Sequence, residues 1–133
     1  MKFSTKTTYG LRAMINLSRK SAVDNISLPE IAREENISLK YLERLFSKLK
    51  KSGLVISEKG MSGGYKLAKN SKDINVFEII TALEGALSPF HCVDEKGKIK
   101  CSSKCSCGAT SVLLKVQQAV NSTLKKTKLS DLT

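Results

Sequence analysis

The sequence predicts a mainly α-helical protein with a small β-hairpin wing: a winged helix-turn-helix followed by a long C-terminal dimerisation helix. Three observations predict this fold class. Apolar residues recur at helical spacing along most of the 133 residues, and one glycine-rich turn separates two short strand-like segments. The net charge of +11 favours a polyanionic partner. We expect a winged helix-turn-helix at 1–88, a cysteine-rich loop at 89–107 and a helix with a tail at 108–133.

The first two helices are expected to be amphipathic. The first runs from about Lys6 to Ser18. The second begins at an S-x-x-E capping box made by Ser27 and Glu30, with Pro29 in its first turn, where a missing N–H costs nothing. The residues expected to face the core are Leu11, Met14, Ile15, Ile31 and Ala32.

A third helix is expected after a tight connection at 35–37. Ser38 is placed to cap its start, and Gly53 to end it as the residue after the C-cap. Its apolar positions at helical spacing are Leu39, Leu42, Leu45, Phe46 and Leu49. This third helix is the second of a helix-turn-helix pair, which is the one that enters the major groove of DNA.

A β-hairpin and a fourth helix should follow. The β-branched segment 54–56 and the segment 65–68 are expected as strands around a turn at 57–64 that holds three glycines. Asn75 is then placed to cap a helix that ends near Gly85. The inward residues of this helix are Val76, Ile79, Ile80 and Leu83.

The last helix, at about 109–126, carries an apolar stripe that no later element covers. The stripe has 4-3-4-3 spacing and consists of Ala109, Leu113, Val116, Val120 and Thr123. A monomer would expose this stripe to water. We therefore expect a partner helix, most simply from a second copy in a homodimer.

Positive charge is concentrated around the third helix and the hairpin. Residues 38–72 hold nine Lys or Arg but only two acids, an excess of seven positive charges. Arg44 can bind guanine bidentately and Glu43 can accept from cytosine, whereas lysines late in the helix (48, 50 and 51) suit phosphates. Glycines at the wing let the backbone approach DNA closely. The residues expected to contact DNA are Ser38, Lys40, Tyr41, Glu43, Arg44, Lys48, Lys59, Gly60, Ser62, Gly63, Thr5 and Lys6.

Other function classes fit the sequence less well. A basic helix face is often just a solvated face, but here it coincides with a capping box, a short helix pair and a glycine-tipped hairpin. Membrane-surface binding is the weaker interpretation because the basic helix lacks Trp and uses its apolar face for the core. One His and few acids leave little for catalysis, so we expect no enzyme. The start of the chain is polar, which predicts a cytoplasmic protein.

All four cysteines fall within 92–107, which indicates a metal or redox site rather than a disulfide framework. Thiolates suit Zn and iron–sulfur clusters alike, and a thiol switch without metal is a further alternative. Zn sites favour closely paired cysteines, and the spacing C-x8-C-x3-C-x-C contains only one such pair. The candidate ligands are Cys92, Cys101, Cys105 and Cys107, with His91 as a further possibility for the fourth position.

Several blocks of the sequence resemble the Rrf-two (Rrf2) family of bacterial transcription regulators. They are STKTTYGLRAM, LPEIAREENISLKYLERLFSKLKKSGLV, SEKGMSGGYKLA, VFEIITALEG and KLSDL, and they extend over nearly the whole chain in the family's order. The resemblance implies a homodimeric winged-helix repressor or activator that binds a palindromic site in double-stranded DNA. It also implies an iron–sulfur cluster in the cysteine loop that tunes DNA binding, in response to redox state, iron–sulfur status or nitric oxide.

The resemblance also assigns the cysteines. Cys92, Cys101 and Cys107 match the three cysteines of the cluster-binding members, and Cys105 is extra. Relatives complete the ligand set with a His or an Asp, and at those two places this chain has Thr110 and Thr8. The fourth ligand therefore differs here, and the resemblance leaves open whether the cluster has two irons or four. Zn remains the alternative metal.

Overall fold

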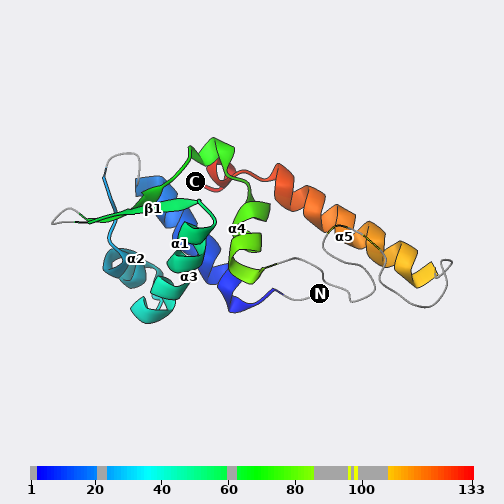
Figure 1. Cartoon of the computed structure of the whole chain (residues 1–133), viewed down its shortest axis with the longest axis horizontal. Helices are drawn as coiled ribbons and strands as arrows, with labels where there is room; N and C mark the ends of the chain where they lie inside the picture. Colours follow the sequence, from blue (N-terminus) through cyan, green and yellow to red (C-terminus); the bar gives the residue numbers. More distant parts are fainter. Residues whose placement is uncertain (1–2, 21–23, 60–62, 86–95, 97, 99–107) are drawn as a thin grey trace.

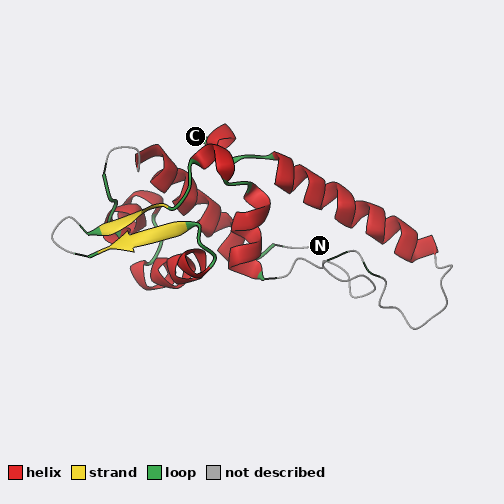
Figure 2. Cartoon of the chain, turned by 45° about the horizontal axis from the view of Figure 1, so that its top comes forward, coloured by secondary structure: helices red, strands yellow, loops and turns green. Residues whose placement is uncertain are grey.

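A computed structural model of the chain describes residues 3–20, 24–59, 63–85, 96, 98 and 108–133. The predicted fold class is confirmed: helices dominate, and the strands form one antiparallel hairpin. Helices α1–α4 and the hairpin gather into one compact part, from which α5 projects (Figure 1, Figure 2). The elements are α1 (Thr5–Lys20), α2 (Leu28–Glu35), α3 (Leu39–Lys51), β1 (Val55–Glu58), β2 (Gly64–Leu67), η1 (Ser71–Asp73), α4 (Val76–Glu84), α5 (Gly108–Lys126) and η2 (Leu129–Leu132).

The core is aliphatic and lies between α1, α3 and α4. Met14 and Leu17 of α1, Phe46 of α3 and Ile79 of α4 are completely buried. The ring of Phe46 meets Tyr65 of β2 edge to face, with the ring centroids 5.0 Å apart. Burial of these side chains is the main favourable contribution to folding, and the Phe46–Tyr65 contact joins α3 to the hairpin.

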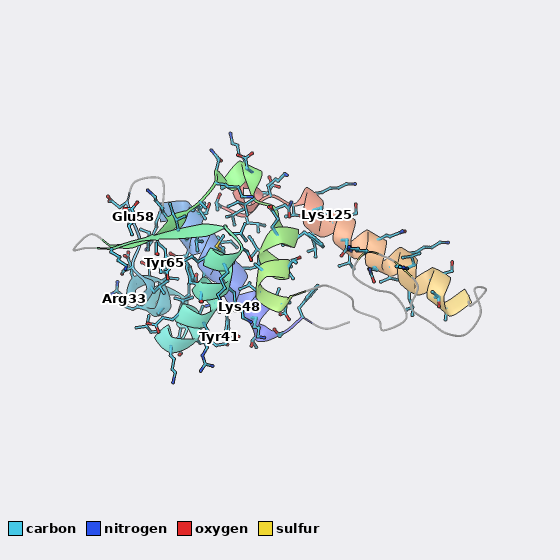
Figure 3. All side chains as sticks on the ribbon, in the orientation of Figure 1. Arg33, Tyr41, Lys48, Glu58, Tyr65 and Lys125 are labelled. Atoms are coloured by element: carbon cyan, nitrogen blue, oxygen red, sulfur yellow. The ribbon has the colours of Figure 1, made fainter. Side chains whose placement is uncertain are left out.

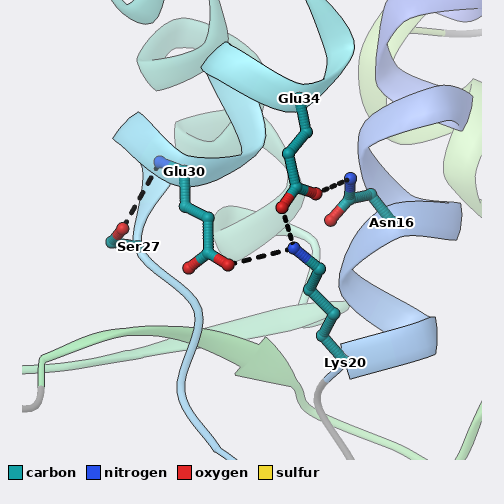
Figure 4. Close-up of polar contacts among 5 residues, drawn as sticks. All are labelled: Asn16, Lys20, Ser27, Glu30 and Glu34. Atoms are coloured by element: carbon teal, nitrogen blue, oxygen red, sulfur yellow. Dashed lines mark hydrogen bonds and ion pairs between the residues drawn. The ribbon is translucent and has the colours of Figure 1, made fainter.

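Helix α2 differs from its prediction at its N-terminus. Ser27 caps the helix by accepting from the backbone N–H of Glu30 at 3.4 Å, as expected. The reciprocal half of the predicted capping box is wrong, because the Glu30 carboxylate instead accepts from the Lys20 ammonium at 3.0 Å. Lys20 also pairs with Glu34, which in turn accepts from Asn16 (Figure 4). These contacts join the C-terminal end of α1 to α2.

Helix α3 is bounded as the sequence predicts. The Ser38 hydroxyl accepts from the backbone N–H of Tyr41 at 3.2 Å, and Gly53 follows the helix with a φ of 75°. That positive φ is the left-handed conformation in which glycine is least strained. Leu39 was expected in the core, but it is 39% exposed because it lies in the first turn of α3, at the edge of the buried face.

Strand β1 begins one residue later and ends two residues later than expected, and β2 is shifted by one residue toward the turn. Val55 pairs with Leu67 and Glu58 with Gly64. Ile26 adds backbone hydrogen bonds to Tyr65 at 2.9 and 2.8 Å, so the segment before α2 lies along β2. A Cβ atom at Gly64 would meet the carbonyl oxygen of Ile26 at 2.6 Å. Glycine at this position is therefore required by strand packing inside the protein.

Helix α4 begins with a complete capping box of Asn75 and Glu78. The tail after α5 returns to this region: the Val76 N–H donates to the Thr127 carbonyl at 2.9 Å, and Leu129 is fully buried in the core. Lys125 places its ammonium 4.7 Å from the centre of the Phe77 ring. The C-terminal end of α5 is thus anchored on α4, which orients the rest of the helix outward (Figure 1).

The apolar stripe of α5 is only partly covered by the chain itself. Val112 and Val116 are 59% and 38% exposed, whereas Leu113 and Val120 are half-buried. The two buried side chains of the helix are polar, Thr110 and Gln117. They lie seven residues apart, on a different side of the helix from Val112 and Val116. Of the predicted stripe, Ala109, Val116 and Thr123 are exposed while Leu113 and Val120 are half-buried, and Val112 adds an exposed valine beside it. A partner helix that covers this stripe stays a prediction.

Candidate nucleic-acid interface

The outer face of α3 carries charged side chains that are unpaired among the described residues. Lys40, Glu43 and Arg44 are exposed and follow each other at helical spacing. Among the described residues, none of the three has an ion pair or a side-chain hydrogen bond. The opposite face of the same helix buries Leu42, Leu45, Phe46 and Leu49. The helix is thus held by its apolar face and presents free donors and one free acceptor outward.

Tyr41 ties the first turn of α3 to α1. Its ring meets Tyr9 of α1 edge to face, with centroids 5.8 Å apart. Its hydroxyl lies 3.3 Å from the Thr5 hydroxyl at the start of α1 (Figure 3). Tyr41 and Thr5 were both expected at the DNA interface, and the structure brings them together.

Arg12 fixes the turn between α2 and α3, a role that the sequence did not predict. Its guanidinium lies 5.6 Å from the centre of the Tyr9 ring and donates to the Glu35 carbonyl. The Arg12 Nε atom also lies 3.8 Å from a carboxylate oxygen of Glu35. Asn36, next in the chain, has a left-handed φ of 54°. A cation that stacks on an aromatic ring while it binds a loop carbonyl holds α3 at a set angle to α1. Only the fold brings these residues together, so no local pattern could have indicated them.

Lys50 was expected to suit phosphate, and in the free protein it also contacts the wing. Its ammonium donates to the Ser57 hydroxyl of β1 at 2.7 Å, which links the end of α3 to the wing. On the wing itself, Lys66 pairs with Glu58 at 2.6 Å, and Glu58 also accepts from Asn25 at 2.7 Å. These contacts lower the pKa of Glu58 below its ordinary value. Lys50 and Lys66, two of the positive charges counted in the sequence, therefore help to hold the wing in place.

The side chain of Lys48, on α3, reaches toward the end of α4 (Figure 3). Its ammonium donates to the Leu83 carbonyl at 3.4 Å. Partial burial of the ammonium and the neighbouring charge of Lys6 lower the pKa of Lys48, while Glu84 opposes this shift. Two lysines held this close repel each other, and an anion placed between them would relieve the repulsion. The structure thus brings together Lys6 and Lys48, which were predicted separately.

The rest of the predicted wing contact is only partly described. Lys59 is exposed at the end of the hairpin, and Gly63 is half-buried. Gly60 and Ser62 lie outside the described residues. No helix within the described ranges is both long and apolar enough to cross a membrane.

The predicted metal ligands lie outside the described residues: Cys92, Cys101, Cys105, Cys107 and His91. Within the ranges that the structure does describe, no group of three or more His, Cys, Asp or Glu side chains could hold a metal ion. Thr110 is buried in the first turn of α5, and Thr8 is exposed on α1. A threonine hydroxyl is a poor ligand for a thiophilic centre, so neither side chain suits the fourth ligand position.

Comparison with known proteins identifies the family. Residues 3–133 match the family model Rrf2, described as an iron-dependent transcriptional regulator. The regulator IscR of Cereibacter sphaeroides is 43% identical over 93 residues, which is 68% of this chain and 60% of that protein. The regulator CymR of Bacillus subtilis is 37% identical over 132 residues, which is 99% of this chain and 89% of that protein. The chain therefore spans about three fifths of this IscR but nearly all of CymR.

Solved structures agree with this result. The structure of CymR, the global cysteine regulator of B. subtilis, has a TM-score of 0.84 at 36% identity and covers 99% of this chain and 95% of its own. The IscR of T. potens has a TM-score of 0.81 at 35% identity and covers 99% of this chain and 85% of its own. The similarity therefore includes the fold, the order of the elements and α5.

Proposed function

Because this chain belongs to the Rrf2 family of transcription regulators, we propose that it is a cytoplasmic homodimer that binds a palindromic operator in double-stranded DNA and acts as a repressor. Family members are regulators and not enzymes. The single observation that carries the DNA-binding part of the proposal is the outer face of α3, where Lys40, Glu43 and Arg44 are exposed and unpaired among the described residues. Charges left without partners in the free protein are available to a nucleic acid.

The residues divide into two groups by their surroundings. Lys40, Glu43 and Arg44 are free to reach base edges in the major groove. The phosphate-contact group consists of Thr5 and Lys6 at the start of α1 together with Lys48, and these residues are held by hydrogen bonds or by neighbouring charge. A held side chain suits a backbone contact that does not depend on sequence. Ser38 and Tyr41 support the start of α3, and Lys59, Gly60, Ser62 and Gly63 would meet the backbone from the wing.

Replacement of Arg44 by Ala is expected to weaken operator binding by about 1–3 kcal/mol and to relax the preference at one base position, because a bidentate contact to guanine is lost. Lys48→Ala is the matched comparison. It should weaken binding to all sequences alike and reduce the salt slope by about 1. Fluorescence anisotropy with operator and random duplexes over a range of salt measures both effects. Equal loss of operator and random DNA binding in Arg44→Ala would show that Arg44 does not read bases.

For the sensing part, we propose an iron–sulfur cluster held by Cys92, Cys101 and Cys107, with Cys105 in the fourth position and His91 as the next choice. The donor set supports this, since thiolates are the usual ligands of such clusters. Thr110 and Thr8 do not offer the nitrogen or carboxylate that relatives use, which favours Cys105. When bound, the cluster would supply a redox-sensitive centre whose gain or loss tunes operator binding in response to redox state, iron–sulfur status or nitric oxide.

A second candidate is a thiol-responsive regulator without a cluster, in which the same cysteines form a disulfide or bind Zn. The similarity to CymR favours it, because that alignment extends over 132 residues and so includes the whole cysteine segment. CymR of B. subtilis is described as a global cysteine regulator. The two candidates share the DNA-binding part and differ only in what the cysteines hold.

Anaerobic purification with iron, sulfide and zinc analysis separates the candidates. A brown protein with iron and sulfide is expected. Cys92→Ala, Cys101→Ala and Cys107→Ala should each lose the visible absorbance of the cluster, because each removes one thiolate ligand. Loss in Cys105→Ala as well would identify Cys105 as the fourth ligand. A colourless wild type with stoichiometric zinc and no sulfide would exclude the cluster. Full retention of colour in Cys101→Ala or Cys107→Ala would exclude that cysteine as a ligand and so contradict the proposed ligand set.

A further inference from the structure

Glu84, the last residue of α4, holds the beginning of α1. One of its carboxylate oxygens accepts from the backbone N–H of Ser4 at 3.1 Å, from the Ser4 hydroxyl, and from the Thr7 hydroxyl at 2.8 Å. The Ser4 hydroxyl in turn accepts from the backbone N–H of Lys6 at 3.2 Å. A carboxylate at this place also interacts favourably with the positive end of the α1 dipole.

The environment of Glu84 keeps it ionised. Its partial burial alone would raise the pKa, but the hydrogen bonds from Ser4 and Thr7 outweigh burial, and the pKa lies below the ordinary value. The carboxylate is therefore charged at neutral pH. A charged acceptor holds its donors more firmly than a neutral one does.

The same turn of α4 holds Lys48. The Leu83 carbonyl accepts from its ammonium, and the charges of Glu84 and Lys6 both act on it. The side chain of Leu83 packs against Gly10 of α1, where a Cβ atom would lie 2.1 Å from Leu83 Cδ1. This close approach fixes the end of α4 against α1. The last turn of α4 thus binds both parts of the phosphate-contact group, the start of α1 and Lys48.

We propose that Glu84 is a positioning residue for DNA binding: it sets the place of Thr5, Lys6 and Lys48 without contacting DNA itself. This proposal rests on the proposed DNA-binding function. It predicts the direction in which the affinity for DNA changes when the Glu84 carboxylate is removed. A negative charge beside a phosphate-binding group repels DNA, so electrostatics alone would make Glu84 unfavourable for binding. Positioning has the opposite effect, because lysines that are already in place lose less freedom on binding.

Two substitutions of Glu84 that remove the same charge separate these effects. Glu84→Gln keeps an oxygen that can accept from Ser4 and Thr7, whereas Glu84→Ala keeps none. DNA binding should weaken in the order wild type, Glu84→Gln, Glu84→Ala, with the Ala variant about tenfold weaker, roughly the loss of one phosphate contact, and a salt slope smaller by about 1. Asp73→Asn, an equal charge change at an exposed residue of η1, should bind as well as wild type or slightly better.

A double-mutant cycle measures the coupling between two substitutions in their effect on DNA affinity. General destabilisation by Glu84→Ala would not produce a coupling that is specific to Lys48. Glu84→Ala should couple with Lys48→Ala, so that the two losses together are smaller than their sum, but should be additive with Arg44→Ala. Thermal melts by circular dichroism restrict the comparison to variants that are folded at the assay temperature. If a folded Glu84→Ala variant bound DNA as tightly as wild type or more tightly, or if the cycle with Lys48 were additive, the inference would be overturned. Failure of the wild type to bind DNA would instead contradict the proposed function.

Discussion

Glutamate at both Val112 and Val116 is expected to convert the protein to a monomer that no longer binds its operator with measurable affinity. Both side chains are exposed on α5 of the isolated chain, so the change should leave each subunit folded. In a homodimer they would be buried against a two-fold partner, and each unpaired buried charge costs several kcal/mol. We expect the dissociation constant of the dimer to rise at least about a hundredfold. Light scattering over a range of micromolar protein concentrations measures this dissociation constant.

A control for this result places the same charges elsewhere on α5. Ser111 and Gln118 are exposed on the side of the helix opposite Val116, so the pair Ser111→Glu and Gln118→Glu should remain dimeric. A stable dimer of the Val112→Glu, Val116→Glu variant would remove α5 as the interface. A monomer that still bound a palindromic operator with full affinity would contradict the need for two half-sites.

Phe46→Ala is expected to have the largest effect on folding. Phe46 is completely buried in the middle of α3 and contacts Tyr65 of the wing. Removal of a buried phenyl ring costs about 3–5 kcal/mol, because the core loses contacts and a cavity remains. A domain of this kind has only about 5–15 kcal/mol in total, so the variant should melt well below the wild type. Denaturant unfolding followed by circular dichroism gives the free energy.

Phe46→Leu is the comparison for the Phe46 prediction. Leu fills much of the same space, so it should cost clearly less than Ala while it still removes the ring contact with Tyr65. If both variants cost under about 1 kcal/mol, Phe46 is not the anchor between α3 and the wing, since a buried ring cannot be lost so cheaply.

Local signals in the sequence located the elements well. Helical spacing of apolar residues predicted the core faces of α3 and α4, and Leu42, Leu45, Ile79 and Leu83 are buried as expected. The caps Ser38 and Asn75 also bind as predicted. Such signals succeed because the partners of a cap or of a helix face lie within one or two turns along the chain.

The errors occur where the true partner is distant in the sequence. Glu30 was assigned to its own helix start, but the ammonium of Lys20 on α1 takes its carboxylate. Lys50 was expected to suit phosphate, and the sequence did not indicate that its ammonium also donates to the Ser57 hydroxyl on the neighbouring strand. The sequence also did not indicate that the Ile26 backbone requires glycine at 64. A charged or small residue has many possible partners, and the sequence does not rank them.

The sequence by itself determined the fold class, the position of the third helix with its charged outer face, the excess of positive charge and the grouping of the four cysteines. These follow from composition and from spacings shorter than a helix. Only the tertiary structure decided which cations remain free, and it joined the start of α1, Lys48 of α3 and Glu84 of α4 into one group. Glu84 lies 80 residues from Ser4 in the chain, and packing of α1 against α4 brings them into contact. Hydrogen bonds across such separations depend on which helix faces pack together, and this is a property of the whole chain.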